Sequence, residues 1–143
     1  STEFTLANNM CPLPAGSYYV SQEFGVDGHR GIDLSTRKTP GIPVYAVQAG
    51  TVALVQVWDG HTLTGNQSWG NMILINHVVT NGVTYTTRYS HLATVPSFSV
   101  GQSLDRGTQL STAGTTGNST GIHLHLEVTA NGTLVNPRNY VPI

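Results

Sequence analysis

The feature that most constrains the fold is the strict alternation of side-chain types in residues 121–128, which read GIHLHLEV. Successive side chains of a β-strand point to opposite faces of its sheet. On a strand, His123, His125 and Glu127 therefore share one face, and the leucines between them share the other with Val128. Because a strand rises about 3.3 Å per residue, the Cα atoms of the two histidines stand about 7 Å apart, and their imidazoles can converge on one metal ion. The alternative is a pair of surface histidines on a half-exposed strand.

The composition favours strands and turns over helices. The 143 residues include 16 glycines and 7 prolines, and threonine and valine are abundant. Glycine costs about 1 kcal/mol in a helix interior, whereas valine and threonine are favoured in strands. A chain of this length fits one domain with its own hydrophobic core. We therefore predict a single, mostly β domain.

The charge and the cysteine content exclude several classes of protein. Only 9% of the residues are charged and the formal net charge is -1, so the chain lacks the basic field that drives nucleic-acid binding. The single cysteine, Cys11, forms neither an internal disulfide nor a cysteine-type zinc site, and we expect it to be a small packed residue. No apolar run approaches the length of a membrane span. A bound metal would therefore use histidine and carboxylate ligands.

Further strands are predicted where apolar runs lie between turn residues. The predicted strands cover residues 18–24, 44–47, 50–58, 71–79, 83–89 and 133–135. Asn-Gly pairs at 81–82 and 131–132 are the strongest hairpin signals in the chain. Residues 93–112 are interpreted as a turn-rich region, and residues 1–19 as an extended N-terminal arm that wraps on the body.

The six histidines of the chain allow a catalytic zinc site. Such sites commonly use three protein ligands and keep one position for water. His29 and Asp33 lie in a stretch too rich in glycine for a helix, so we expect loop geometry to bring them together. Either His123 or His125 would complete the ligand set, and the other would lie where a general base is needed. His91, at the end of a predicted strand, would supply the group that steadies developing charge.

Three motifs occur in the order and spacing of a known family. They are His29-X-X-X-Asp33, Tyr89-Ser90-His91-Leu92 and His123-Leu124-His125-Leu126-Glu127. These motifs resemble the signatures of the lysostaphin-type zinc metallopeptidases, which hydrolyse peptide bonds in bacterial peptidoglycan. The resemblance covers about residues 20–140. It implies a compact antiparallel β-sheet domain with a metal site in a groove walled by loops, and it makes residues 20–143 the catalytic domain.

The resemblance also implies the roles of individual residues. His29, Asp33 and His125 would hold one Zn²⁺ per chain, while His123 and His91 would be catalytic and would not bind the metal. His123 would take the proton of the attacking water, and His91 would help to hold the charged intermediate. The implied partners are peptidoglycan peptides, in a cross-bridge or in the stem. Such an enzyme would be a monomer that works outside the cytoplasm, as a secreted, cell-envelope or phage-encoded lysin.

Two loops are predicted to shape the groove. Many members of that family have a longer loop before the histidine that corresponds to His29, with an arginine or tyrosine near the metal. Residues 59–70 form a polar loop that is long for a hairpin connection, and we expect it to rebuild that wall with Trp69 against the substrate. Gly114 and Thr115, in a glycine-rich loop, are also expected to contact substrate.

A second class of function is a metal-free relative that serves as a wall-binding or hydrolase-activating module. Such modules usually lack some of the five site positions, whereas this chain has all five. A β-rich carbohydrate-binding or scaffold protein with incidental histidines would not explain three ordered motifs. Among the other marked residues, His77 is expected in the core or at a strand end and His61 in a solvated loop. Glu127 would either support a metal ligand or be solvated at a strand end.

Overall fold

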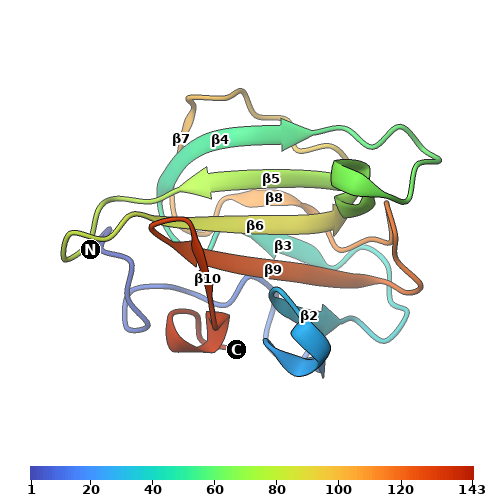
Figure 1. The fold of residues 1–143 in the computed structure, drawn as a ribbon, viewed down its shortest axis with the longest axis horizontal. Helices are drawn as coiled ribbons and strands as arrows, with labels where there is room; N and C mark the ends of the chain where they lie inside the picture. Colours follow the sequence, from blue (N-terminus) through green and yellow to red (C-terminus); the bar gives the residue numbers. More distant parts are fainter.

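The computed structural model describes residues 1–143 as an antiparallel β fold with ten strands and three short 3₁₀ helices (Figure 1). The strands are β1 (Tyr19–Gln22), β2 (Ile32–Ser35), β3 (Pro43–Tyr45), β4 (Gly50–Gln56), β5 (Asn71–Asn76), β6 (Tyr85–Leu92), β7 (Ser103–Leu104), β8 (Gln109–Thr112), β9 (His123–Ala130) and β10 (Thr133–Val135). The 3₁₀ helices are η1 (Val26–Gly28), η2 (Gly65–Trp69) and η3 (Pro137–Asn139). The mostly β, antiparallel class predicted from the sequence is therefore confirmed.

Eight strands form the main sheet and two form a smaller one. The main sheet has the order β1-β2-β9-β6-β5-β4-β7, and β10 pairs with β9 outside this path. Strands β3 and β8 pair separately and lie behind the central strands in the view of Figure 1. No helix is both long and apolar enough to cross a membrane. Strand β9 is an inner strand of the main sheet and lies between β2 and β6.

The alternation in residues 123–128 is realised on β9. Leu124, Leu126 and Val128 are each 0% exposed and belong to the hydrophobic core. His125 is the direct cross-strand partner of Asp33 on β2, and on the other side it pairs with Ser90 of β6. Directly opposed residues in a sheet have Cβ atoms about 4.5–5.5 Å apart. The register of β9 therefore places a histidine and a carboxylate together on the face opposite the core.

The N-terminal arm packs on the body through apolar side chains. Phe4 and Leu13 are 1% and 2% exposed, and the ring of Phe4 lies 4.7 Å from the rings of both Tyr85 and His77. His77 is buried, as expected of a core histidine, and bonds the carbonyl of Ala49 and the hydroxyl of Thr87. Burial lowers the pKa of His77 to about 4, so this ring is neutral at pH 7.

Residues 93–112, interpreted as turn-rich, also hold two short strands that the sequence analysis did not predict. This region holds β7, which pairs with β4, and β8, which pairs with β3. The two strands have only two and four residues, and Leu104 and Leu110 are their only buried large apolar side chains. Strands this short show no periodic run in the sequence, and long-range pairing stabilises them.

Candidate active site

Three donor atoms converge where β2, β9 and the loop after η1 meet. Asp33 Oδ1 lies 2.8 Å from His125 Nδ1 and 3.1 Å from His29 Nε2. The ligand atoms of the three residues all lie within 4.8 Å of one another. His29 Nε2 is buried and makes no hydrogen bond, although Asp33 Oδ1 lies near it. A buried nitrogen without a partner beside a carboxylate and a second imidazole fits a Zn²⁺ ligand set.

The charges of this group depend on one another. Burial raises the pKa of Asp33. The hydrogen bond from His125 and the charges of the neighbouring histidines together lower it by more, so the net shift of the pKa is downward. Burial lowers the pKa of His125, but its bonds to Asp33 and Glu127 outweigh burial and raise it. Asp33 is therefore an ionised carboxylate, the form that a metal requires.

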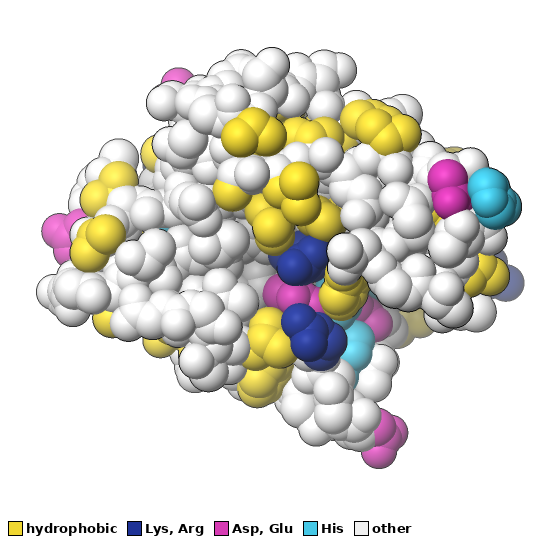
Figure 2. Space-filling model, turned by 45° about the horizontal axis from the view of Figure 1, so that its top comes forward, with side chains coloured by type: hydrophobic (Ala, Val, Ile, Leu, Met, Phe, Trp, Pro, Cys, Tyr) yellow, Lys and Arg dark blue, Asp and Glu magenta, His cyan; other side chains and the backbone are white.

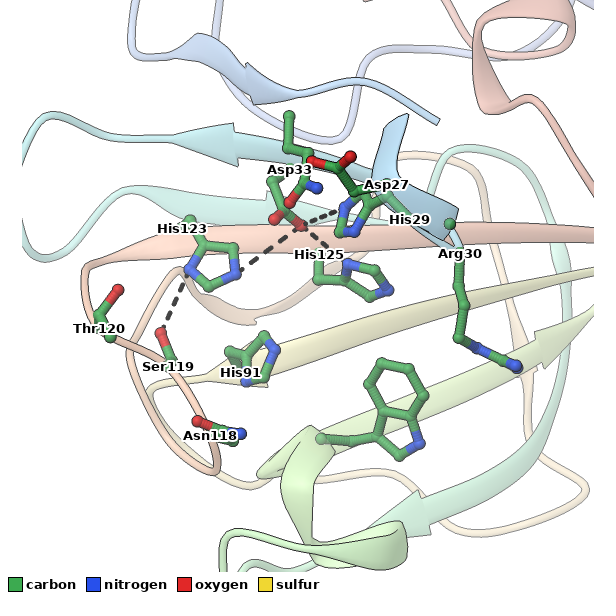
Figure 3. Close-up of a pocket in the computed structure, with 13 residues that line it drawn as sticks. Asp27, His29, Arg30, Asp33, His91, Asn118, Ser119, Thr120, His123 and His125 are labelled. Carbon is green, nitrogen blue, oxygen red and sulfur yellow. Dashed lines mark hydrogen bonds and ion pairs between the residues drawn. The ribbon is translucent and has the colours of Figure 1, made fainter. Parts of the chain in front are cut away.

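Two more histidines, His91 and His123, flank the donor group (Figure 3). Main-chain carbonyls fix their tautomers. His123 Nδ1 donates to the carbonyl of Gly121 at 2.8 Å, and His91 Nδ1 donates to the carbonyl of Thr116 at 2.7 Å. A carbonyl only accepts, so in each neutral ring Nδ1 carries the proton and Nε2 is the free base. The Nε2 of His123 lies 3.8 Å from Asp33 Oδ1.

His91 is further distinguished by its burial and its backbone. It is 6% exposed and has a left-handed φ of 61°. Burial lowers the pKa of His91 to about 4. Its ring centroid lies 4.8 Å from that of His123 and 6.1 Å from that of His125. A non-glycine residue with positive φ at such a position is costly by about 1 kcal/mol or more, as is common at functional sites.

Glu127 supports His125 from behind. It is 1% exposed, and its Oε2 accepts a hydrogen bond from His125 Nε2 at 2.8 Å. Its Oε1 lies 3.2 Å from Arg88 Nε, and its Oε2 lies 3.5 Å from Arg30 Nε. Of the two roles that the sequence left open for Glu127, solvation at a strand end was wrong. The bond to Nε2 leaves the Nδ1 of His125 directed at Asp33.

Trp69 closes one side of the pocket. Its ring lies 5.2 Å from that of His125 and is nearly parallel to it, at 24°. The guanidinium of Arg88 lies 4.8 Å from the ring of Trp69, and that of Arg30 lies 5.8 Å from it. The end of the predicted 59–70 loop, wound into η2, therefore reaches the histidines.

The pocket has a volume of about 460 Å³ and includes all five predicted site histidine and aspartate positions as well as Trp69. It is also lined by residues that the sequence analysis did not single out, namely Gln22, Asp27, Gly28, Arg30, Asn118, Ser119 and Thr120. Asn118, Ser119 and Thr120 lie just before the histidine strand, and Arg30 lies inside the first motif. Proximity to the motifs was the only signal available for them.

Gly114 and Thr115 do not line this pocket. Gly114 accepts a hydrogen bond from the backbone of His123 at 3.1 Å, and a Cβ on Gly114 would lie 2.6 Å from the backbone of Ala93. Thr115 bonds the hydroxyl of Ser119 at 3.0 Å. Both residues shape the loop that carries the lining residues. His61 is exposed in a loop, as expected, and lies outside the pocket.

The fold and the site together define the class of a metallopeptidase. A two-histidine, one-aspartate donor group lies in a groove of an antiparallel β-sheet, beside two further histidines. The chain belongs to peptidase family M23, whose model matches residues 27–137. This confirms the resemblance to lysostaphin-type peptidases seen in the motifs, and peptidases of this family are zinc metallopeptidases.

Individual relatives agree with this assignment. The chain is 36% identical over 109 residues to the peptidoglycan DD-endopeptidase ShyA of Vibrio cholerae, and the matched residues are 76% of this chain and 22% of the relative. It is 33% identical over 125 residues to the murein hydrolase activator NlpD of Salmonella dublin, covering 86% and 29%. The catalytic domain of lysostaphin from Staphylococcus simulans superposes with a TM-score of 0.64 and 27% identity, covering 85% of this chain and 90% of that one. The chain thus spans less than a third of these two curated relatives.

Proposed function

We propose that this chain is a zinc-dependent endopeptidase that hydrolyses peptide bonds in bacterial peptidoglycan, and that it works in the cell envelope or after secretion. The observation that carries the proposal is the convergence of His29 Nε2, Asp33 Oδ1 and His125 Nδ1 within 4.8 Å, beside two histidines in the same pocket. These three residues would hold one Zn²⁺. The ion would polarise the scissile carbonyl and lower the pKa of the attacking water.

His123 is the general base of the proposed mechanism. Its Nδ1–H is held by the carbonyl of Gly121, so its Nε2 is free to accept a proton. That nitrogen lies 3.8 Å from Asp33 Oδ1, at the edge of the donor group. It would therefore lie next to an attacking water bound at this group. A positioned base of this kind contributes about 10²–10⁴ in rate.

His91 has a role that its tautomer restricts. With Nδ1–H donated to Thr116, the neutral ring offers only a lone pair at Nε2, so it cannot donate to a negatively charged oxygen. It becomes a donor only after Nε2 has taken up a proton. We propose that the proton that His123 takes from the attacking water passes on to His91 Nε2, whose ring centroid lies 4.8 Å away, and from there to the leaving amine. While it carries this proton, the His91 cation steadies the charged intermediate.

A hydrolase-activating module is the second candidate, because the murein hydrolase activator NlpD is similar over 86% of this chain. An activator has no need of a metal or of a positioned base. This chain nevertheless keeps three convergent donors and two histidines with fixed tautomers. These features favour the enzyme.

Digestion of purified sacculi tests the two candidates. Zinc-loaded protein would be incubated with sacculi of two kinds, directly cross-linked through stem peptides or bridged by oligoglycine, and the released muropeptides would be weighed by mass spectrometry. We expect cleavage products whose summed mass exceeds that of the uncut material by one water for each peptide bond cut, and none from a His125→Ala variant. If the protein alone leaves the sacculi intact but speeds their degradation by a second hydrolase, it is an activator instead.

A further inference from the structure

A second pocket of about 400 Å³ lies next to the candidate active site and shares Arg30 with it. Its lining combines two arginines and a buried carboxylate with apolar and small residues, namely Arg30, Arg88, Glu127, Leu74, Leu134, Thr86, Thr129 and Gly132. Figure 2 shows basic side chains next to acidic ones in a hollow at the centre of this face, with hydrophobic side chains around it. The proposed mechanism uses none of the arginines.

The two guanidinium groups contact the same carboxylate through one edge only. Arg88 Nε lies 3.2 Å from Glu127 Oε1, and Arg30 Nε lies 3.5 Å from Glu127 Oε2. Of the terminal nitrogens, only Nη1 of Arg88 has a contact, with the sulfur of Met72 at 3.7 Å. The side chain of Arg30 is 56% exposed. Two cations and one anion leave a net positive charge, with N–H groups that point to no protein acceptor.

The face of Trp69 orients both arginines. Arg88 lies over its ring at 4.8 Å and Arg30 at 5.8 Å. Guanidinium groups stack well on aromatic rings, and a stacked, planar guanidinium binds a carboxylate with two parallel hydrogen bonds. A paired cluster held in this way loses less side-chain entropy on binding than free surface arginines would.

We infer that Arg30 and Arg88 form a subsite for a free carboxylate of the substrate, which makes peptides with such a group near the scissile bond the preferred substrates. The inference rests on the proposed function and narrows it. The subsite lies close to the donor group, since only the imidazole of His125 and the carboxylate of Glu127, joined at 2.8 Å, separate the two. An extended peptide advances about 3.3–3.6 Å per residue, so a chain of two or three substrate residues is long enough to pass the His125–Glu127 pair and join the donor group to the subsite.

The remaining lining sets the size of the residue that carries the carboxylate. Leu74 and Leu134 supply an apolar wall, and Gly132 leaves space beside it. A residue with a short apolar side chain next to its carboxylate fits these surroundings. Stem peptides carry free carboxylates, whereas an oligoglycine bridge offers none along its length. The subsite therefore favours cleavage of stem-peptide cross-links over cleavage of oligoglycine bridges.

The test uses one substrate in two charge states. Cross-linked stem-peptide dimers isolated from sacculi would be used intact, or after conversion of their free carboxylates to methylamides. For the parent we expect kcat/KM to fall about 10-fold or more on amidation, since hydrogen bonds to charged groups are the strong ones. Arg30→Gln should lose about 10-fold on the intact dimer and little on the amidated one. Arg106→Gln, which removes a distant exposed charge, should behave like the parent.

A second variant guards against structural effects. Removing Arg88 would leave Glu127 buried without its closest cation, so Arg88→Lys is used because it keeps the charge and loses the planar fork. Zinc content and melting temperature would be measured for every variant. We expect Arg88→Lys to keep both and to discriminate less between the two dimers.

The outcomes separate the subsite from the enzyme activity. If the parent cleaves both dimers equally well, or if Arg30→Gln loses equally on both, the subsite is wrong although the peptidase activity stands. If oligoglycine-bridged sacculi are cleaved and no stem-peptide dimer is, the subsite is wrong although the peptidase activity stands. If neither substrate is cleaved, the proposed function fails, and calorimetry with the monomeric stem peptide decides about the subsite. Binding that needs both the carboxylate and Arg30 then supports the subsite, and equal binding of the amidated monomer overturns it.

Discussion

Replacement of Glu127 should weaken the binding of zinc without removing any ligand. Glu127 is 1% exposed and accepts the Nε2–H bond of His125 at 2.8 Å, so it fixes the ring with Nδ1 toward Asp33. Carboxylates in this position usually contribute 10- to 100-fold in metal affinity. Glutamine keeps the size and an acceptor oxygen but not the charge. Hydrogen bonds to charged groups contribute about 1 kcal/mol more than neutral ones, which corresponds to about 5- to 10-fold in affinity.

Alanine in place of Glu127 should have the larger effect. It removes the acceptor, frees the imidazole to rotate and leaves Arg88 and Arg30 without the carboxylate that lies 3.2 and 3.5 Å from them. We expect a loss of about 100-fold in zinc affinity and a lower melting temperature, because breaking a buried ion pair costs about 3–5 kcal/mol. The graded order of parent, glutamine and alanine is the signature of a positioning residue.

The assay is competition for zinc against a chromogenic chelator, with thermal unfolding of the zinc-free proteins measured in parallel. Glu23→Gln is the matched control, since it also breaks a carboxylate–arginine pair, with Arg138, but on the exposed surface away from the site. Equal zinc affinities of the parent and both Glu127 variants would refute the reasoning. The reasoning would also be refuted if Glu23→Gln lost zinc affinity in proportion to its loss of stability without zinc, because the effect would then reflect stability and not the position of His125.

The remaining predictions concern four other positions and the ligand His125. His125→Ala should lose its zinc, and elemental analysis should find about one zinc per chain in the parent and almost none in the variant. His123→Ala and His91→Ala should keep zinc and fold while losing about 10²–10⁴ in kcat, and loss of the metal in either would make that residue a ligand. Trp69→Ala should lower kcat/KM on peptidoglycan fragments about 3- to 10-fold at unchanged zinc content, whereas unchanged kinetics would leave Trp69 a structural role only. His77 has a folded pKa of about 4 against 6.5 when exposed, so the unfolded chain binds more protons between these values. His77 should therefore contribute about 3 kcal/mol to the fall in the free energy of unfolding from pH 7 to pH 4, measured by urea titration in chelator, and His77→Gln should make this fall smaller by about that amount.

The sequence predicted the parts of the site that follow from local periodicity. The alternation from His123 to Val128 assigned one face of β9 to the core, and the structure confirms it with three fully buried side chains. The 59–70 loop was recognised by its length and polarity. The pairing of Asp33 with His125 could not be derived from spacing, because 92 residues separate them and only the order of β2 and β9 in the sheet makes them neighbours.

The arginine cluster was missed for the same reason. Arg30 and Arg88 look like isolated surface charges in the sequence, and Glu127 had two equal interpretations. They meet because β6 pairs with β9, which sets Arg88 opposite Glu127, and because the loop that carries Arg30 lies beside them. For Gly114 and Thr115, a glycine-rich stretch predicted close approach to a ligand, but neither residue lines the pocket. At Gly114 the close approach is to the backbone of Ala93.

A common device orients three of the four histidines in the pocket. Each uses one ring nitrogen to donate to an acceptor outside the centre: His125 to Glu127, His91 to Thr116 and His123 to Gly121. The other nitrogen of each ring faces the pocket, where Nδ1 of His125 lies 2.8 Å from Asp33 Oδ1. Which of the two nitrogens faces the pocket separates the proposed ligand from the two proposed proton carriers. His125 offers Nδ1, whereas His91 and His123 offer Nε2, the nitrogen that extends farther from the backbone. Carbonyls fix the tautomers of His91 and His123, and the buried carboxylate of Glu127 fixes the orientation of the His125 ring. Because the three rings are oriented before anything binds, little reorganisation remains to be done during a reaction.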